Sequence, residues 1–238
     1  MTKKQEKKRV EELLRVYRER NAALRDAVDS VNLMVTEARS EGGLLDDLVH
    51  SVKMRVKDAK SLRAKLQRKM KEAHELDVEF DITTDNLFDK ITDIAGYRIM
   101  HLHPKQMDVI NRAILHMLAD RSYTLVEGPE ARVWDLESEA YFNSIGIKTK
   151  HTTEKLYSSV HYVIRTNRRA PVTCEIQVRT LADELWGAVD HKLNYKHKLT
   201  SIACKEQIKS LAHVTTSCNR LVTSIFASHA EWSKWEKH

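Results

Sequence analysis

Two neighbouring stretches of alternating residues constrain the fold of this chain more than any other feature. Residues 172–180, VTCEIQVRT, alternate apolar side chains with Thr, Glu, Gln and Arg, and residues 157–165, YSSVHYVIR, alternate in a similar way. Because successive side chains of a β-strand point to opposite faces, both stretches predict strands with one apolar and one polar face. The linker NRRAP, residues 167–171, predicts a hairpin. The polar faces would then form one surface, which either meets solvent or lines a cleft.

The remaining pattern surrounds this hairpin with helices. Apolar residues recur at helical spacing in several segments, and Gly42, Gly43, Gly128 and Pro129 break the pattern. The predicted helices cover residues 9–40, 44–57, 61–75, 104–118, 181–195 and 202–235, with strands at 94–102 and 123–127 and an acidic loop at 76–92. Ser61 is a plausible N-cap of the third helix. Strands in the middle of the chain, with helices before, between and after them, indicate an α+β fold with a mixed sheet.

Charge gives the first indication of a ligand. The chain has a formal net charge of +6, and residues 53–71 hold nine Lys or Arg against one acid, Asp58. Such a run is either a solvated helix face or a phosphate-binding surface. The three cysteines form no C-x-x-C pair, which argues against a disulfide framework or a zinc site. No stretch approaches about eighteen consecutive apolar residues and the N-terminus lacks the apolar centre of a signal peptide, so we expect a cytoplasmic protein without a membrane partner.

Two acids are candidates for a metal site. Asp93 precedes the strand at 94–102, and Glu175 lies on the polar face of the hairpin. Two carboxylates repel each other unless they share a cation, and magnesium (Mg²⁺) is typically held by one or two carboxylates together with substrate phosphates. A magnesium nucleotide would link these acids to the basic run, and phosphoryl-type transfer needs those parts. Neither a P-loop nor a G-x-G-x-x-G motif is present.

The position of Asp93 relative to Arg98 is open at this stage. The two residues are five apart, so a regular strand would place them on opposite faces. Either Asp93 lies in the preceding turn or Gly96 bends the strand, since glycine inside a strand pattern suggests a bulge or a close approach.

Four ordered motifs resemble the synthetase domain of RelA/SpoT-type alarmone synthetases. The motifs are R-x-K at 55–57 with Lys65 downstream, D-I-A-G-Y-R at 93–98, Y-S-S-V-H at 157–161, and E-I-Q-V-R-T at 175–180 followed by Trp186 and HKLNYK at 191–196. The resemblance implies a mixed-sheet, nucleotidyltransferase-like synthetase core at 51–197, an N-terminal helical segment at 1–50 and a C-terminal helix at 198–238, as in small single-domain members. It also implies transfer of the β,γ-pyrophosphate of ATP to the 3′-hydroxyl of GDP or GTP.

The resemblance assigns roles to particular residues. Asp93 and Glu175 would be the catalytic carboxylates and hold Mg²⁺, and Glu175 would share the metal or help to activate the acceptor hydroxyl. The residues implied to bind ATP are Arg55, Lys57, Lys65 and Arg98. The residues implied to contact the acceptor nucleotide are Tyr157, which would stack on guanine, His161 and Gln177. The polar face of the hairpin is therefore expected to line an active-site cleft.

The acceptor side departs from the family pattern. Leu156 stands where members usually carry Gly before the stacking Tyr, and Lys148, Lys150 and Lys155 do not lie at the usual offsets. An alternative function is therefore that of a toxic relative that pyrophosphorylates the 3′ end of tRNA, with an antitoxin as partner. A catalytically inactive nucleotide- or RNA-binding module is a third reading, which the intact Asp93 and Glu175 argue against.

Several residues have structural interpretations. His101 and His103 share a strand face and are expected to be structural more often than metal ligands. Trp186 is expected to pack the helix at 181–195 on the sheet. Four apolar residues near the C-terminus form a stripe for which core packing is favoured over a homo-oligomer or partner surface; they are Leu221, Ile225, Trp232 and Trp235.

Overall fold

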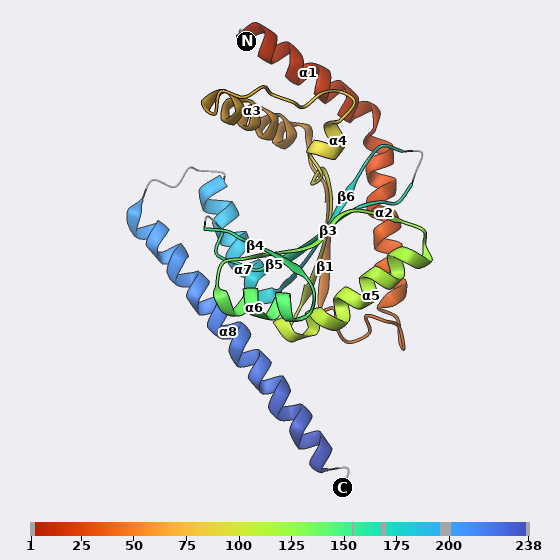
Figure 1. The fold of residues 1–238 in the computed structure, drawn as a ribbon, viewed down its shortest axis with the longest axis vertical. Coiled ribbons are helices and arrows are strands. Elements are labelled where there is room, and N and C mark those ends of the chain that lie inside the picture. The colour runs from red at the N-terminus through yellow and green to blue at the C-terminus, as the bar shows by residue number, and fades with distance from the viewer. Residues whose placement is uncertain (1–2, 154, 168–169, 196–200, 237–238) are drawn as a thin grey trace.

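A six-stranded mixed sheet forms the centre of the molecule (Figure 1). The structure is a computed structural model that describes residues 3–153, 155–167, 170–195 and 201–236. The strands lie in the order β1 (Ser51–Val56), β2 (Ala95–His101), β6 (Cys174–Thr180), β5 (Ser159–Arg165), β3 (Thr124–Val133) and β4 (Lys148–His151). β2 and β6 are parallel, as are β3 and β4, and the other neighbours are antiparallel. The predicted α+β class and the predicted pairing of β5 with β6 are confirmed.

The apolar face of the sheet packs against α2 (Asn21–Ala38) and α5 (Met107–Asp120). Two buried tyrosines on this face are anchored by these helices. The hydroxyl of Tyr97 on β2 donates to Asn32 of α2 at 3.1 Å, and the hydroxyl of Tyr162 on β5 donates to Asn111 of α5 at 2.7 Å. Because neighbouring residues along a strand point in opposite directions, the opposite face is left for the polar residues.

The N-terminal half contains helices whose limits differ from the predicted ones. The segment at 9–40 is two helices, α1 (Lys3–Glu19) and α2, which meet at Arg20. α1 packs against α3 (Ala59–Glu75). The N-cap of α3 is Asp58 and not Ser61, because the Asp58 carboxylate accepts the Ser61 backbone N–H at 2.8 Å. A short helix, α4 (Leu87–Lys90), lies inside the predicted acidic loop.

The predicted helix at 44–57 is wrong. Residues 51–56 form β1, an edge strand that pairs with β2 in antiparallel register. Val52, Met54 and Val56 alternate with Lys53 and Arg55, so the sequence also carries the period of two that a strand requires. Pairing with β2 decides between the two patterns, which a short apolar segment leaves ambiguous.

The region after residue 123 contains more structure than predicted. β3 continues through Gly128 and Pro129, where its register with β5 shifts. A Cβ atom at Gly128 would lie 2.3 Å from the main-chain oxygen of His161, so glycine permits the close approach of the two strands. α6 (Leu136–Ser144) and β4 were not predicted. The N-cap of α6 is Asp135, whose carboxylate accepts the Ser138 N–H.

The predicted helix at 104–118 is the short 3₁₀ helix η1 (Pro104–Gln106) followed by α5. The helix expected at 181–195 is α7 (Leu181–Asp190) with a π-helical turn, η2 (His191–Tyr195). α8 (Ile202–Trp235) packs against α7 with its first half, and its second half extends away from the body (Figure 1). Among the described helices, none has the length and apolar character that crossing a membrane requires.

Two predictions for the C-terminal region are wrong. Trp186 does not pack α7 on the sheet, because it lies in a second apolar cluster with Ile208 and Ala212 of α8 and its indole N–H donates to the Ile208 oxygen at 2.8 Å. The C-terminal stripe is not core. Its members are exposed, from 56% for Trp232 to 81% for Trp235.

His101 and His103 have the predicted structural role. Both are buried, and Nδ1 of His101 lies 3.1 Å from the main-chain oxygen of His103. Burial lowers the pKa of His101 to about 4, so its ring is neutral at pH 7. In the part of the chain that the structure describes, no group of three or more metal-binding side chains is found.

Candidate active site

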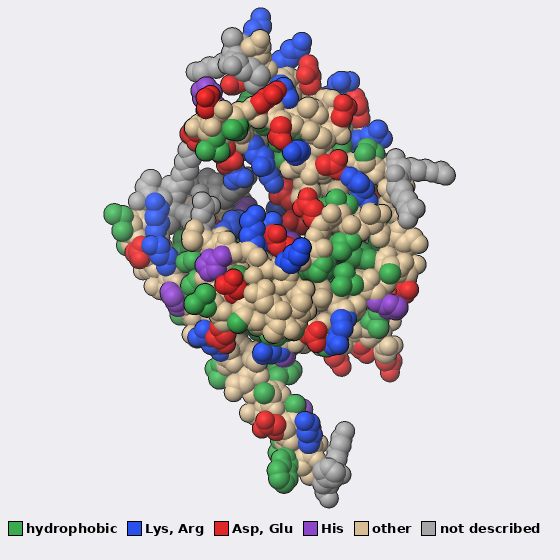
Figure 2. All heavy atoms as spheres, viewed as in Figure 1, with side chains coloured by type: hydrophobic (Ala, Val, Ile, Leu, Met, Phe, Trp, Pro, Cys, Tyr) green, Lys and Arg blue, Asp and Glu red, His purple; other side chains and the backbone are tan. Residues whose placement is uncertain are grey.

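A row of polar side chains crosses the entire sheet. The cross-strand register places Lys53 opposite Arg98, Arg98 opposite Gln177, Gln177 opposite His161, His161 opposite Glu130 and Glu130 opposite Lys148. Residues directly opposite each other in a sheet point to the same face. The polar rows predicted for β5 and β6 therefore belong to a surface built from all six strands. Figure 2 shows Lys and Arg side chains gathered around a hollow at the centre of the molecule.

Asp93 lies in the turn before β2, which resolves its position relative to Arg98. Lys57 and Lys65 hold its two carboxylate oxygens at 2.8 and 2.7 Å. Lys57 follows β1 and Lys65 is on α3, so the predicted basic run does contribute to the site, although only in part as a helix. Burial by itself raises the pKa of Asp93, but the ammonium groups of Lys65 and Lys57 outweigh burial and bring this pKa to about 2. The carboxylate is thus ionised at neutral pH.

Glu175 is the second predicted carboxylate, and it is buried on β6. Nδ1 of His161 lies 2.8 Å from one oxygen of Glu175, and the amide of Gln177 donates to the other at 2.6 Å. Burial by itself raises the pKa of Glu175, but the hydrogen bonds from His161 and Gln177 outweigh burial and hold this pKa below its ordinary value. Burial lowers the pKa of His161, so we assign a neutral ring that donates from Nδ1 and accepts the hydroxyl of Ser159 at Nε2.

The two acids fit a magnesium site chemically. Both are ionised carboxylates, which supply the oxygen ligands that Mg²⁺ prefers, and two protein ligands leave coordination positions for phosphate oxygens. Arg132 of β3 comes within 4.0 Å of Glu175. Arg132 was not predicted as a site residue, because the strand was expected to end before Gly128, whereas β3 continues to Val133.

A buried carboxylate that the sequence analysis did not select connects several cations of the site. Glu184, on the first turns of α7, pairs with Lys53 at 2.8 Å, Arg98 at 2.9 Å and Arg179 at 3.4 Å. Arg98 and Arg179 also donate to the same oxygen of Gln177. No familiar motif marks Glu184, although an acid shortly after a predicted helix start is a weak signal.

The predicted site residues fall into separate groups. Asp93 joins Lys57 and Lys65, whereas Arg98 joins Gln177, His161 and Glu175 through hydrogen bonds. Arg55 is exposed on β1, where Gly96 is its register partner.

Tyr157 lies outside β5 and is only 8% exposed. The guanidinium carbon of Arg179 lies 4.7 Å from its ring centroid, and the Trp186 ring lies beside it. The structure therefore does not place Tyr157 on the open polar face.

Three lysines had uncertain positions in the sequence. Lys148 and Lys150 lie on β4, opposite Glu130 and Arg132 of β3, so the sheet brings both to the polar face. Lys155 lies beyond β4 and is exposed. Two of these lysines do not have the sequence spacing usual in the family, but strand pairing nevertheless brings them to the polar face.

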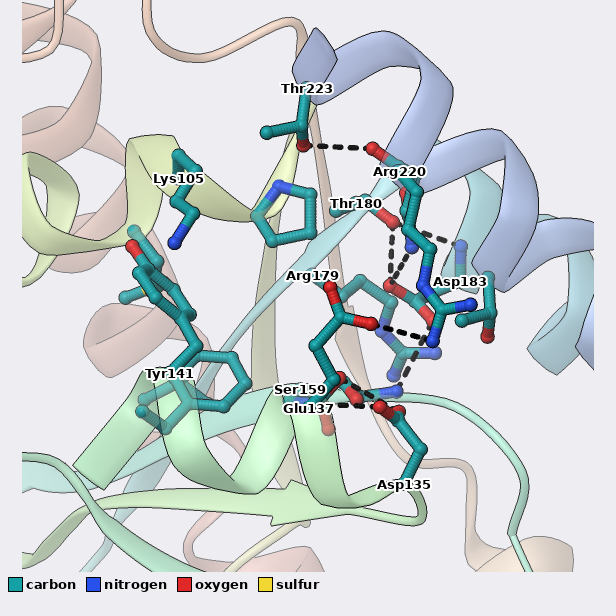
Figure 3. A pocket seen from close by; sticks show the side chains of 18 of the residues that line it. Lys105, Asp135, Glu137, Tyr141, Ser159, Arg179, Thr180, Asp183, Arg220 and Thr223 are labelled. Atoms are coloured by element: carbon teal, nitrogen blue, oxygen red, sulfur yellow. Dashed lines mark hydrogen bonds and ion pairs between the residues drawn. The ribbon is translucent and has the colours of Figure 1, made fainter. Parts of the chain in front are cut away.

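A cavity of about 380 Å³ lies beside this face, between α6, η1 and α8 (Figure 3). Arg179, Thr180 and Asp183 line it from β6 and the start of α7, and Asn219 and Arg220 line it from α8. Arg220 forms an ion pair with Glu137 of α6 at 2.6 Å. The buried carboxyl of Asp183 has a raised pKa because burial disfavours its charge.

Comparisons with known proteins agree on one family. The family model described as "Region found in RelA / SpoT proteins" matches residues 54–200. GTP pyrophosphokinase YwaC of Bacillus subtilis (strain 168) is 30% identical over 155 residues, which cover 62% of this chain and 59% of YwaC. The chain thus matches about three fifths of the length of that relative.

Solved structures share the fold. A GTP pyrophosphokinase family protein from Streptococcus pneumoniae has a TM-score of 0.66 at 21% identity, covering 90% of this chain and 95% of that one. The small alarmone synthetase 1 from Bacillus subtilis, solved bound to its product pppGpp, has a TM-score of 0.58 at 22% identity, covering 86% and 93% of the two chains.

Proposed function

This chain belongs to the RelA/SpoT family, and on that premise we propose that it transfers the β,γ-pyrophosphate of ATP to the 3′-hydroxyl of GDP or GTP. The observation that carries the proposal is the pair of ionised carboxylates, Asp93 and Glu175, each surrounded by basic or hydrogen-bonding groups. The similarity to the GTP pyrophosphokinase YwaC and to a small alarmone synthetase solved with its product pppGpp supports the same reaction. A reaction between these nucleotides is consistent with a cytoplasmic protein.

In the proposed reaction, the 3′-oxygen of the acceptor attacks the β-phosphorus of ATP. The bond between the α- and β-phosphates breaks, AMP leaves with the electron pair, and the hydroxyl proton passes to a base or to solvent. Asp93 and Glu175 would hold Mg²⁺, which when bound supplies charge neutralisation on the phosphates. A carboxylate whose pKa is lowered is a weaker base, so the environment of Glu175 favours the role of metal ligand over that of proton acceptor.

Lys57 and Lys65 are proposed to exchange partners when ATP binds. The ammonium groups of both lysines form ion pairs with Asp93 in the structure. Phosphate oxygens offer both lysines alternative charge-assisted hydrogen bonds. This exchange would release Asp93 for the metal without leaving either lysine unpaired. Arg55 and Arg98 are proposed to lie against the adenine and phosphates, since a planar guanidinium can both stack and bind phosphate.

The acceptor is proposed to lie toward β5, β3 and β4. His161 and Gln177 are adjacent in the cross-strand row, and Arg132, Lys148 and Lys150 extend the same face with positive charge. A cluster of cations at one end of this face suits the 5′-phosphates of GDP or GTP. Tyr157 is proposed to stack on the guanine.

The decisive experiment offers one labelled donor to several acceptors. Purified protein is incubated with Mg²⁺, ATP labelled in the β- and γ-phosphates, and GDP, GTP, ATP or tRNA, and products are separated chromatographically. We expect label on GDP or GTP and one AMP for each transfer. Label on tRNA alone, or release of free pyrophosphate with every acceptor, would overturn the proposal. Asp93→Asn serves as the inactive control.

A further inference from the structure

The ring of Tyr157 is covered by the side chains of Arg179 and Trp186. The guanidinium carbon of Arg179 lies 4.7 Å from the ring centroid, which is cation–π distance. The Trp186 ring, 5.5 Å from the Tyr157 ring between centroids and tilted by 37°, flanks it from α7. With 8% of Tyr157 exposed, a purine base finds no free face on this ring.

The guanidinium of Arg179 is held at a defined position over the Tyr157 ring, called here its seat. One terminal nitrogen donates to the Gln177 side chain at 2.7 Å, and the other lies 3.4 Å from Glu184. Gly187 on α7 makes room for it, because a Cβ atom there would lie 2.9 Å from Nη1 of Arg179. Only 4% of Arg179 is exposed, so this position is set by surrounding groups on β6 and α7.

The seat is nevertheless incomplete, and there is space beside it. Nε of Arg179 is buried and has no hydrogen-bond partner among the described residues. A buried N–H without a partner makes the seated state less favourable than a fully bonded one. Arg179 also lines the cavity of about 380 Å³ shown in Figure 3, together with the Asp183 carboxyl. The guanidinium can therefore leave the ring without crossing packed core.

We propose that Arg179 is an internal competitor of the acceptor base, whose guanidinium holds the stacking position on Tyr157 and must leave before guanine can bind there. The inference rests on the proposed function, since it takes Tyr157 as the ring that stacks on the acceptor. Arg179 thereby weakens acceptor binding and sets how much nucleotide is needed to fill the site. A purely structural role for Arg179 would have the opposite sign, because its removal would damage the site.

Two substitutions test, in different ways, whether removing the Arg179 guanidinium from the ring strengthens or weakens acceptor binding. Arg179→Met keeps an unbranched apolar side chain but removes the guanidinium. Gly187→Ala keeps the arginine at position 179, but the added methyl group displaces its terminal nitrogen from the seat. Alanine is favourable inside a helix, so this substitution should not destabilise α7. Calorimetric titration with GDP, in the presence of Mg²⁺ and an ATP analogue whose methylene group replaces the oxygen between the α- and β-phosphates, measures the dissociation constant without turnover.

We expect both variants to bind GDP more tightly than the wild type, by about 5-fold for Arg179→Met, the size expected for loss of one competing cation–π contact. Arg220→Met is the matched control, because it removes the same charge from the same cavity lining but makes no contact with Tyr157; its GDP affinity should stay at the wild-type value. Tyr157→Ala should abolish the tightening when combined with Arg179→Met. GDP binding that is unchanged or weaker in both Arg179→Met and Gly187→Ala overturns the inference.

Failure of this inference is separable from failure of the proposed function. Product formation by the wild-type protein from ATP and GDP tests the function alone. Product from the wild type combined with no tightening in either variant overturns the role of Arg179 and leaves the function intact. If Arg179→Met does not fold, Gly187→Ala decides the outcome, because it changes no group that is proposed to contact a nucleotide.

Discussion

Two groups of residues proposed to bind the donor and the acceptor differ in how they are held before a ligand binds. The donor side, defined here as Asp93, Lys57 and Lys65, consists of charged groups paired with one another and partly open to solvent. The acceptor side, defined as Tyr157, Arg179 and Trp186, consists of rings and a guanidinium packed against α7 and α8.

This difference separates two kinds of binding cost. On the donor side, a phosphate and a metal replace partners of the same charge type, so little desolvation is added. On the acceptor side, a base must displace a buried side chain from a ring before it gains any stacking. We therefore expect the donor side to respond mainly to charge substitutions and to pH, and the acceptor side to respond to packing substitutions.

The largest expected effect is the loss of turnover when either proposed metal-binding carboxylate is replaced. Asp93→Asn and Glu175→Gln should each lower turnover by at least about 10²-fold, because each removes a negative charge proposed to hold the metal. Initial rates of product formation from ATP and GDP measure this effect. Glu137→Gln, a surface glutamate paired with Arg220, is the matched control and should retain the wild-type rate. Near-normal turnover in either active-site variant at saturating Mg²⁺ would refute the metal assignment.

Acid should reveal the pairing on the donor side. The folded-state pKa of Asp93 is about 2, below its ordinary value of 3.8, so its stabilisation is fully present above about pH 4 and is lost as the pH falls toward 2. After allowance for the partial exposure of the group, its contribution is about 1–2 kcal/mol. Urea unfolding between pH 5 and pH 2.5 should show a shallower loss of stability in Asp93→Asn than in the wild type. Parallel pH profiles for the two proteins would contradict this pairing.

Substitution of a donor-side cation should sharpen the contrast between the nucleotides. Lys65→Met is expected to raise the KM for ATP by about 10-fold, since it removes a charge-assisted bond to phosphate, and to change the KM for GDP much less. Lys71→Met on the same helix is the control, because Lys71 is exposed and pairs only locally with Glu75. Equal changes in the two KM values would mean that Lys65 does not belong to the donor side.

The smallest effect concerns the cations that β4 brings to the face. Lys148→Met or Lys150→Met should raise the KM for GDP by about 3- to 5-fold and leave the KM for ATP unchanged, because an exposed ammonium contributes a modest charge interaction with phosphate. Lys209→Met, which removes an exposed lysine on α8 paired with Glu206, is the control. A larger effect on ATP than on GDP would place the acceptor phosphates elsewhere.

Local patterns predicted much of the fold. The alternation in residues 157–165 and 172–180 predicted β5, β6 and their common polar face, because strand periodicity is a property of neighbouring residues. Prediction from local patterns failed where a helical and a strand pattern were both present. In residues 51–56 pairing with β2 makes a strand of a segment whose sequence is also compatible with a helix. Such prediction also failed for α8, whose stripe has the spacing of a core-facing helix but extends past the body.

The sequence by itself determined which groups are present and, for β5 and β6, which face of the strand they occupy. Residue type and spacing alone marked Asp93 and Glu175 as candidates for a metal site, and they left the basic run open between a solvated helix face and a phosphate-binding surface. Only the tertiary structure decided which side chains contact one another. It pairs Lys57 and Lys65 with Asp93, joins Glu184 to three cations from three strands, and places Arg179 over Tyr157. The physical reason is the sequence separation over which each property is set. Side-chain direction follows from adjacent backbone geometry, whereas ion pairs and ring contacts join residues that the strand order and helix packing bring together across long stretches of chain.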